Sequence, residues 1–238
     1  MELDYDFLAT TFLLVLTAVP VTLKLTAVSL LFSAPFAFGI ALLRRQAPGL
    51  LPRLAAAYVT FMRGTPMVLQ ILMIYSLLPS LLNALSQTLQ LELDVFSLDP
   101  IWYAYAVFTL NTTALFSEVL RSGLGSVADG QLEAALCAGL TKPQAYIHII
   151  LPQAMTAAMP NICNLTVNLI KGTSLAFLMT VKDMTASAKV AASYGYNYIE
   201  AYMDVLAGYI IVCSIVQAIF YFAEQHVGRY RLSRGKQV

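Results

Sequence analysis

Charged side chains are scarce in this chain. Only 11% of its 238 residues are Asp, Glu, Lys or Arg, and 59% are apolar, whereas soluble domains carry roughly 25% charged residues. The surface of a soluble globule needs more polar cover than this composition supplies. The scarcity therefore excludes an ordinary soluble enzyme and a disordered chain, and it indicates a polytopic membrane protein.

The sequence also lacks the charge and the motifs of several functional classes. The net charge is +1, which gives no field to attract a nucleic acid. Cys137, Cys163 and Cys213 form no Cys-x-x-Cys pair and cannot pair completely. There is no G-x-x-x-x-G-K-S/T phosphate loop, no serine nucleophile elbow and no His-Glu-x-x-His, and His148 and His226 lie far apart in sequence. We expect no enzymatic activity, no metal and no cofactor in this chain.

Charge-free runs predict about five transmembrane helices. Each run approaches or exceeds the ~20 residues that a helix needs to cross ~30 Å of hydrocarbon. The backbone must satisfy its own hydrogen bonds there, so we expect an all-α fold. The runs are 25–43, 64–91, 101–117, 149–170 and 205–223. The apolar stretch 7–19 precedes Pro20 and Lys24, and we expect it either to begin the first helix or to lie at the interface.

The distribution of lysine and arginine predicts how these helices are oriented in the membrane. These cationic residues gather in alternate connecting segments: Arg44, Arg45 and Arg53, then Arg121 and Lys142, then Arg229, Arg231, Arg234 and Lys236. The segment 92–100 has no lysine or arginine. Because cytoplasmic segments carry the excess of lysine and arginine, we expect the N-terminus outside the cell membrane and the C-terminus in the cytoplasm.

The cytoplasmic segment 129–150 predicts a helical hairpin. Residues 133–138 are good helix formers, and Gly139 can end a helix in a left-handed conformation. Thr141 can cap a second short helix with Pro143 early in it. From the residues alone, an ordinary helical hairpin and a docking element for a partner remain equal alternatives.

This segment also resembles a known motif. The pattern of Glu-Ala-Ala, a glycine six residues after the glutamate, and Ile-x-Leu-Pro resembles the signature loop of permease subunits of binding-protein-dependent ABC importers. The matching residues are Glu133, Ala134, Ala135, Gly139, Ile149, Leu151 and Pro152. The resemblance implies that the loop forms the coupling helix, which docks on an ATPase subunit.

Three further segments resemble permeases for polar amino acids. Residues 62–66, 117–123 and 171–175 read MRGTP, SEVLRSG and KGTSL, and the resemblance covers about 22–222, a single permease domain. Gly172 departs from the Asp or Asn of that family, and the run 171–177 resembles permeases for cystine and related sulfur amino acids. The resemblance implies a prokaryotic cell membrane and three kinds of protein partner: ATPase subunits that hold ATP and Mg, a second identical or paralogous permease subunit, and an extracytoplasmic amino-acid-binding protein. Membrane lipid is the further partner that the apolar composition predicts.

Polar residues share one face of the fourth predicted span. They follow at steps of three, four and three: Asn161, Asn164, Asn168 and Lys171. Polar side chains in hydrocarbon cost free energy unless they are hydrogen-bonded or hydrated. This face therefore either lines the substrate pathway or forms hydrogen bonds to neighbouring helices. A stripe of small hydroxyl residues in the first span favours tight packing instead: Thr22, Thr26, Ser29 and Ser33.

Two charged residues flank these spans. Glu118 follows the apolar run 101–117, and it either pairs with Arg121 one turn later or faces the ammonium group of a substrate. Arg63 precedes the Thr65–Pro66 break. Pro66 interrupts the helix and suits a bent, gate-like segment that exposes Arg63 to the pathway; snorkelling of Arg63 to the headgroups is the alternative.

Two other classes of protein compete with the importer. An ion-driven secondary transporter needs its own coupling-ion site and commonly shows an inverted repeat. We find no repeat, and only Glu118 is a candidate intramembrane carboxylate. A membrane-embedded enzyme is disfavoured by the missing catalytic motifs. Co-purification with an ATPase distinguishes the importer from both.

Overall fold

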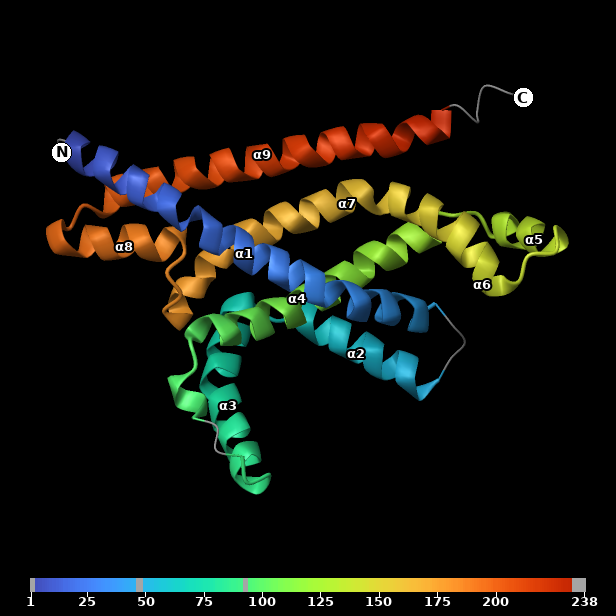
Figure 1. Ribbon diagram of the computed structural model, residues 1–238, viewed down its shortest axis with the longest axis horizontal. Coiled ribbons are helices and arrows are strands. Elements are labelled where there is room, and N and C mark those ends of the chain that lie inside the picture. Colours follow the sequence, from blue (N-terminus) through green and yellow to red (C-terminus); the bar gives the residue numbers. More distant parts are fainter. Residues whose placement is uncertain (1–2, 46–48, 92–93, 233–238) are drawn as a thin grey trace.

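The computed structural model describes residues 3–45, 49–91 and 94–232, with side chains up to residue 226, so the tail cations 229–236 lie outside the described side chains. This part of the chain is helical and contains no strand (Figure 1). In chain order the elements are α1 (Tyr5–Leu43), α2 (Leu50–Gly64), α3 (Met67–Thr88), η1 (Val95–Ser97), α4 (Pro100–Gly125), α5 (Asp129–Cys137), α6 (Lys142–Ala145), η2 (Tyr146–Ile150), α7 (Leu151–Gly172), η3 (Thr173–Met179), α8 (Met184–Gly195) and α9 (Tyr198–Leu232).

Four helical segments are long and apolar enough to cross a membrane: Tyr5–Leu43, Met67–Thr88, Lys142–Met179 and Tyr198–His226. The fifth predicted span is α4, a helix that continues beyond the apolar run 101–117 and past Glu118 to Gly125. Its 26 residues give a length of about 39 Å, enough to cross the hydrocarbon. The class predicted from composition, an all-α polytopic membrane protein, is confirmed.

The first span is longer than its charge-free run. The stretch 7–19 begins α1, which passes through Pro20 and Pro35 without interruption. Asp4 caps this helix, because its carboxylate accepts a hydrogen bond from the Phe7 backbone N–H at 2.9 Å. The stripe of Thr22, Thr26, Ser29 and Ser33 is buried, and α1 packs along α4. The packing role predicted for these small residues is confirmed.

The second span contains a break that the sequence predicted at Pro66. The predicted run 64–91 is too long at both ends, because Gly64 ends α2 and α3 covers only Met67–Thr88. Proline has no N–H to donate, so nearby carbonyls lose their helical partners. The buried Gln70 side chain replaces them: its Nε2 donates to the carbonyls of Met62 at 2.8 Å and Thr65 at 3.1 Å.

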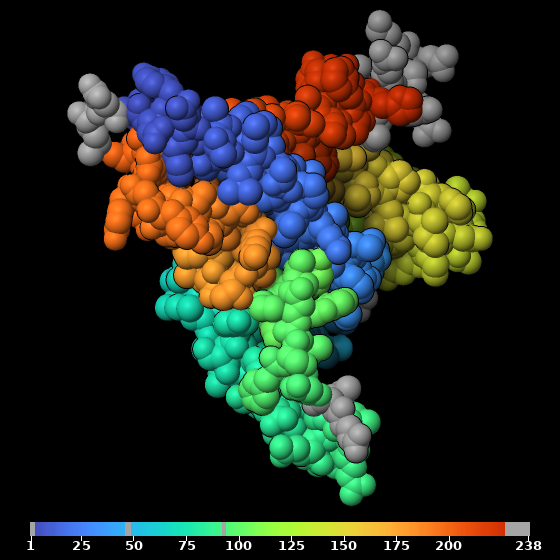
Figure 2. Space-filling model, turned by 60° about the vertical axis from the view of Figure 1, so that its left-hand side comes forward, coloured from blue at the N-terminus to red at the C-terminus, as the bar shows by residue number. Residues whose placement is uncertain are grey.

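The helix α3 leaves the body of the molecule. Figure 2 shows α3 and the start of α4 projecting away from the mass formed by α1, α7, α8 and α9. Apolar side chains along α3 are exposed within this chain: Leu69, Leu72, Met73, Leu77, Leu81 and Leu85. In a membrane such a face meets lipid or another protein.

The helices α4 and α7 approach each other closely at Gly123. A Cβ at this position would lie 2.7 Å from the carbonyl oxygen of Ala154 and 2.8 Å from the Cβ of Ala158. Real Cβ atoms essentially never approach backbone atoms that closely, so the crossing requires glycine. The last residues of the SEVLRSG segment therefore serve helix packing.

Candidate functional site

The segment after α4 forms the hairpin that the sequence predicted. Gly139 adopts φ +84°, a left-handed conformation that glycine adopts without strain. Backbone hydrogen bonds from Gly139 to Leu136 at 3.0 Å and from Leu140 to Ala135 at 3.1 Å close the end of α5. Thr141 then starts α6 in a capping box with Gln144. The helix, glycine turn and second helix are confirmed.

One face of α5 is open to a partner. Glu133 and Ala134 are exposed, as are the small Cys137 and Ala138, whereas Ala135 is buried and faces the rest of the chain. Within the described residues, the Glu133 carboxylate has no ion pair or side-chain hydrogen bond. Small side chains permit close approach, and the free carboxylate can receive a cationic group.

The regular geometry of the α-helix is interrupted where the hairpin joins α7. Residues Tyr146–Ile150 form a π-helical turn, and the Leu151 N–H donates to the Tyr146 carbonyl five residues earlier. Pro152 follows directly, and in an α-helix its ring would clash with the carbonyl of residue 148. The wider turn accommodates the proline and sets the direction in which α6 leaves α7.

The polar face predicted in the fourth span lies on α7. Asn161, Asn164, Asn168 and Lys171 are all exposed, whereas residues 165–167, 169 and 170 on the other side are buried. Within the described part of the chain, no hydrogen bond involves the three asparagine side chains. The shared face is confirmed. Its place in an apolar span requires water or a second protein beside it.

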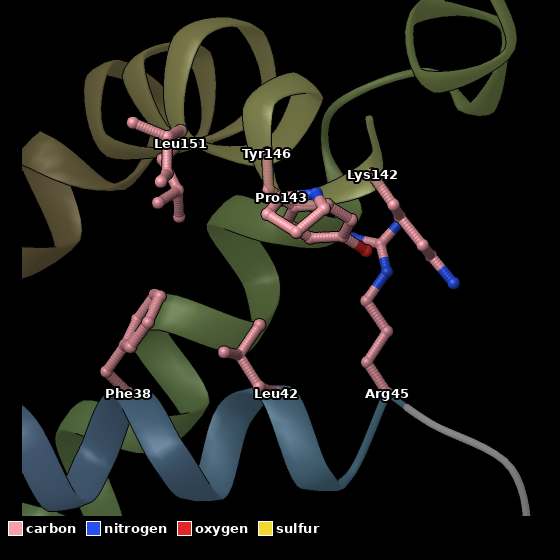
Figure 3. Close-up of a pocket in the computed structure, with 8 residues that line it drawn as sticks. Phe38, Leu42, Arg45, Lys142, Pro143, Tyr146 and Leu151 are labelled. Carbon is pink, nitrogen blue, oxygen red and sulfur yellow. The ribbon is translucent and has the colours of Figure 1, made fainter. Parts of the chain in front are cut away.

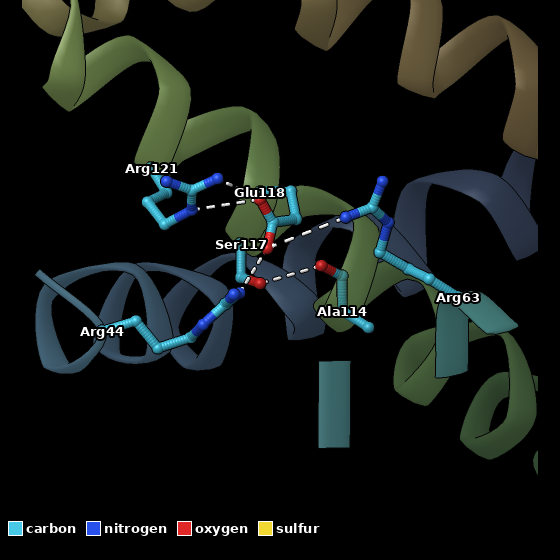
Figure 4. Close-up of polar contacts among 6 residues, drawn as sticks. All are labelled: Arg44, Arg63, Ala114, Ser117, Glu118 and Arg121. Carbon is cyan, nitrogen blue, oxygen red and sulfur yellow. Dashed lines mark hydrogen bonds and ion pairs between the residues drawn. The ribbon is translucent and has the colours of Figure 1, made fainter. Parts of the chain in front are cut away.

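Glu118 lies at the centre of three arginines (Figure 4). Its Oε2 accepts bonds from Arg121 Nε at 3.0 Å and Nη2 at 2.7 Å, and its Oε1 pairs with Arg44 and lies 3.8 Å from Arg63 Nη1. The ion pair with Arg121, one of the two alternatives for Glu118, is present. Both carboxylate oxygens are engaged, so a substrate ammonium would have to displace a guanidinium group.

This cluster ties the ends of α1 and α2 to the C-terminal part of α4. The Glu118 side chain is 16% exposed and Arg44 is 18% exposed, whereas Arg63 is 53% exposed. The sequence analysis did not predict the bond between Glu118 and Arg44. The one sequence feature that pointed to it is that Arg44 is the first charged residue after the apolar run 25–43. No hydrogen bond or ion pair in the described residues joins Glu118 to the asparagines of α7.

The polar network at the α2–α3 break also escaped sequence reasoning. Asn111 on α4 donates from Nδ2 to the Gln70 Oε1 at 2.9 Å, and both side chains are buried. Gln70 thereby fixes the break to α4. The only feature of the sequence that pointed to this network is that Gln70 and Asn111 each place a side-chain amide within an apolar run.

Comparison with known proteins identifies the family. Residues 33–228 match the family described as binding-protein-dependent transport system inner membrane component. The chain belongs to this family. The resemblance that the Glu133–Pro152 motif indicated is therefore confirmed, and the chain is a transport permease of the multi-pass membrane type.

Individual members of the family cover nearly the whole chain. The probable amino-acid permease protein YxeN of Bacillus subtilis is 35% identical over 92% of this chain and 94% of its own length. The L-cystine transport system permease protein TcyL of the same organism is 33% identical over 95% of this chain and 91% of its own. A crystal structure of an amino acid ABC transporter with histidines superimposes with a TM-score of 0.78 at 25% identity, covering 95% of this chain and 100% of the other.

Proposed function

We propose that this chain is the membrane-spanning subunit of an ATP-driven importer of polar amino acids. It acts with a second permease subunit, two ATPase subunits that hold ATP and Mg, and an extracytoplasmic binding protein. The hairpin of α5 and α6 carries this proposal, because it presents a small-residue face and a free Glu133 carboxylate to a partner. The family membership supports it, and this chain has no phosphate loop of its own.

The pathway requires a second permease subunit. The α7 face with Asn161, Asn164 and Asn168 has no partner among the described residues, and the apolar side of α3 is exposed. Two subunits, identical or paralogous, would enclose the polar face in a water-filled path and cover part of α3. Native mass spectrometry of the purified transporter distinguishes the two cases.

Cystine or a related sulfur amino acid is the substrate that we propose first. The support is the KGTSLAF run at 171–177 and the relative named for L-cystine transport. The test is calorimetric titration of the partner binding protein with L-cystine and with other polar amino acids. Binding of an unrelated amino acid alone would reject cystine and leave the importer proposal intact.

Uptake into lipid vesicles tests the importer itself. We expect accumulation of substrate that requires ATP on the side of the ATPase subunits and that survives collapse of ion gradients. Co-purification of an ATPase with this chain is the accompanying measurement. Uptake that follows an ion gradient and needs no ATP would favour a secondary transporter instead.

Glu118→Gln separates the two roles of that residue. Neutralising the carboxylate leaves Arg44 and Arg121 without their anionic partner in a half-buried cluster, which we expect to cost about 1–3 kcal/mol of stability. If Glu118 also binds the substrate ammonium, transport falls further than assembly does. Uptake rate and yield of the assembled complex are the two measurements, and wild-type uptake would eliminate Glu118 as a ligand.

Asn164→Leu applies the same test to α7. A variant that assembles normally but transports poorly supports pathway lining by Asn161, Asn164, Asn168 and Lys171. A variant that assembles poorly shows that the asparagines bond helices together. Arg63→Gln, at the end of α2, tests in the same way whether the guanidinium serves the pathway or only reaches the headgroups.

A further inference from the structure

A cleft opens between the end of α1 and the hairpin. Its volume is about 710 Å³, and its apolar walls include Phe38 and Leu42 of α1 and Leu151 of α7. Figure 3 shows these side chains facing one another across the opening. The volume falls in the roughly 300–1,000 Å³ range of sites that hold small organic ligands.

Two cations stand at one end of this cleft. Arg45 and Lys142 line it, and Figure 3 shows both beside Pro143 and Tyr146, away from Phe38. Arg45 is held in place by a hydrogen bond to the Leu124 carbonyl and by Asp129, whose Oδ1 lies 3.4 Å from Nη2. Lys142 is exposed and has no carboxylate within ion-pair distance among the described residues. With Asp129 counted, the cations leave this end net positive.

The composition of α1 indicates that the cleft lies at headgroup depth. The apolar run of α1 ends at Leu43, and Arg45 follows two residues later, where cationic side chains reach lipid headgroups. One end of the cleft therefore offers positive charge at the interface, and the other offers an apolar wall toward the hydrocarbon. This arrangement matches an anionic phospholipid, whose phosphate and acyl chains need both.

We infer that the cleft binds an anionic phospholipid, with its phosphate at Lys142 and Arg45 and an acyl chain along Phe38, Leu42 and Leu151. The bound lipid bridges α1 and the hairpin of α5 and α6. This inference requires only that the chain spans a membrane, so it can fail independently of the proposed substrate or of ATP coupling.

Lipid retained by the purified transporter tests the charge requirement. The complex is assembled in vesicles of equal parts phosphatidylglycerol and phosphatidylcholine, extracted in mild detergent and weighed by native mass spectrometry. We expect phosphatidylglycerol to be retained in preference, and Lys142→Gln to lower its retention roughly fivefold. The matched control is Lys182→Gln, an exposed lysine remote in sequence from the cleft, which should leave retention unchanged.

Filling the cleft tests its location. Ile147 lines it and is 58% exposed, whereas Ile210 on α9 is 57% exposed and lies outside it. We expect Ile147→Trp to displace the lipid and Ile210→Trp to retain it, with equal yields of assembled complex. If Ile147→Trp fails to assemble, Lys142→Gln still decides the outcome because its side chain is exposed.

Three results would overturn the inference. The first is equal phosphatidylglycerol retention in wild type, Lys142→Gln and Ile147→Trp. The second is equal retention of phosphatidylcholine, which would remove the role of charge. The third is a cross-link from a cysteine at position 147 to an ATPase subunit, because the cleft would then be covered by protein.

Discussion

The Gln70 side chain bonds the backbone carbonyls that lose their helical partner at the break between α2 and α3. Pro66 removes a backbone donor, and the Gln70 amide supplies donors to the carbonyls of Met62 and Thr65 while accepting from Asn111. A buried polar group without a partner costs free energy, so each of these bonds fixes a group that would otherwise be unsatisfied. The break between α2 and α3 is therefore a defined structure with α4 as its support.

Gln70→Ala should destabilise this junction. The substitution leaves Asn111 and two carbonyls without their partner, which we expect to cost about 1–3 kcal/mol and to lower the apparent melting midpoint by a few degrees. Gln87→Ala is the control, because Gln87 lies on the same helix and is exposed. Equal midpoints for both variants would contradict the role assigned to Gln70.

Spacing along one helix predicted some of these contacts and missed others. The bond between Glu118 and Arg121 follows from their separation of three residues on α4. The contacts of Glu118 with Arg44 and Arg63 join separate helices, and no spacing within the sequence fixes how those helices lie beside each other. The polar partners of Gln70 were missed for the same reason.

At the scale of elements, Gly123 sets the distance between α4 and α7. A methyl group there would lie 2.7 Å from the Ala154 carbonyl oxygen, whereas a methyl at Gly125 meets nothing within 4 Å. Overpacking of this kind typically costs about 1–3 kcal/mol. The two glycines lie in the same helix, so they differ chiefly in this contact.

Gly123→Ala should therefore lower thermal stability, while Gly125→Ala should be neutral or slightly stabilising. The measurement is the melting midpoint of each variant in the same detergent, with the yield of assembled transporter as a second readout. Unchanged stability in Gly123→Ala would show that α4 and α7 can separate freely.

Apolar runs predicted the spans but not their ends. The charge-free run of the third span stops at Glu118, although α4 continues to Gly125, because a glutamate ends an apolar run without ending a helix. Three arginines pair with this carboxylate. The helices α2 and α8 are too short or too mixed in composition to form a charge-free run. The sequence allows two positions for the stretch 7–19, the start of the first helix or the interface, because Pro20 and Lys24 follow it. In the structure it begins a continuous α1.

At the scale of the whole molecule, the chain exposes faces that lipid or a second subunit would cover in a membrane. The asparagine face of α7 and the apolar length of α3 both lie open, and the hairpin stands at one end of the molecule (Figure 1). The spacing of the asparagines, at steps of three and four residues, predicted that they share one face of α7. How α3 projects from the body depends on the packing around Pro66, which periodicity does not describe.

The orientation of the chain remains a prediction, and cysteine labelling tests it. In a variant without Cys137, Cys163 and Cys213, a cysteine at the exposed Phe96 should react only with a reagent added outside. A cysteine at Glu133 is the control and should react only from the cytoplasm. Labelling of position 96 from the cytoplasmic side alone would refute the predicted topology.

In the proposed coupling of the hairpin to an ATPase, we expect Gly139 to matter most. Its φ of +84° is strained for any other common residue, and the space around it is open, so a substitution changes the turn without a clash. The cost is about 1–2 kcal/mol, and larger for a β-branched side chain. Gly130 lies in α5, also has nothing within 4 Å, and lacks the positive φ, so it provides a matched control.

The most direct measurement is substrate-stimulated ATP hydrolysis by the complete transporter in lipid vesicles, compared between Gly139→Val and Gly130→Val. We expect both chains to insert in equal amounts, Gly130→Val to keep its stimulation, and Gly139→Val to lose stimulation or to lose the ATPase on purification. Glu133→Lys should show a milder loss, because it reverses the free charge of α5 while preserving the turn. Normal stimulation and uptake in both Gly139→Val and Glu133→Lys would contradict the assignment of this hairpin as the coupling element.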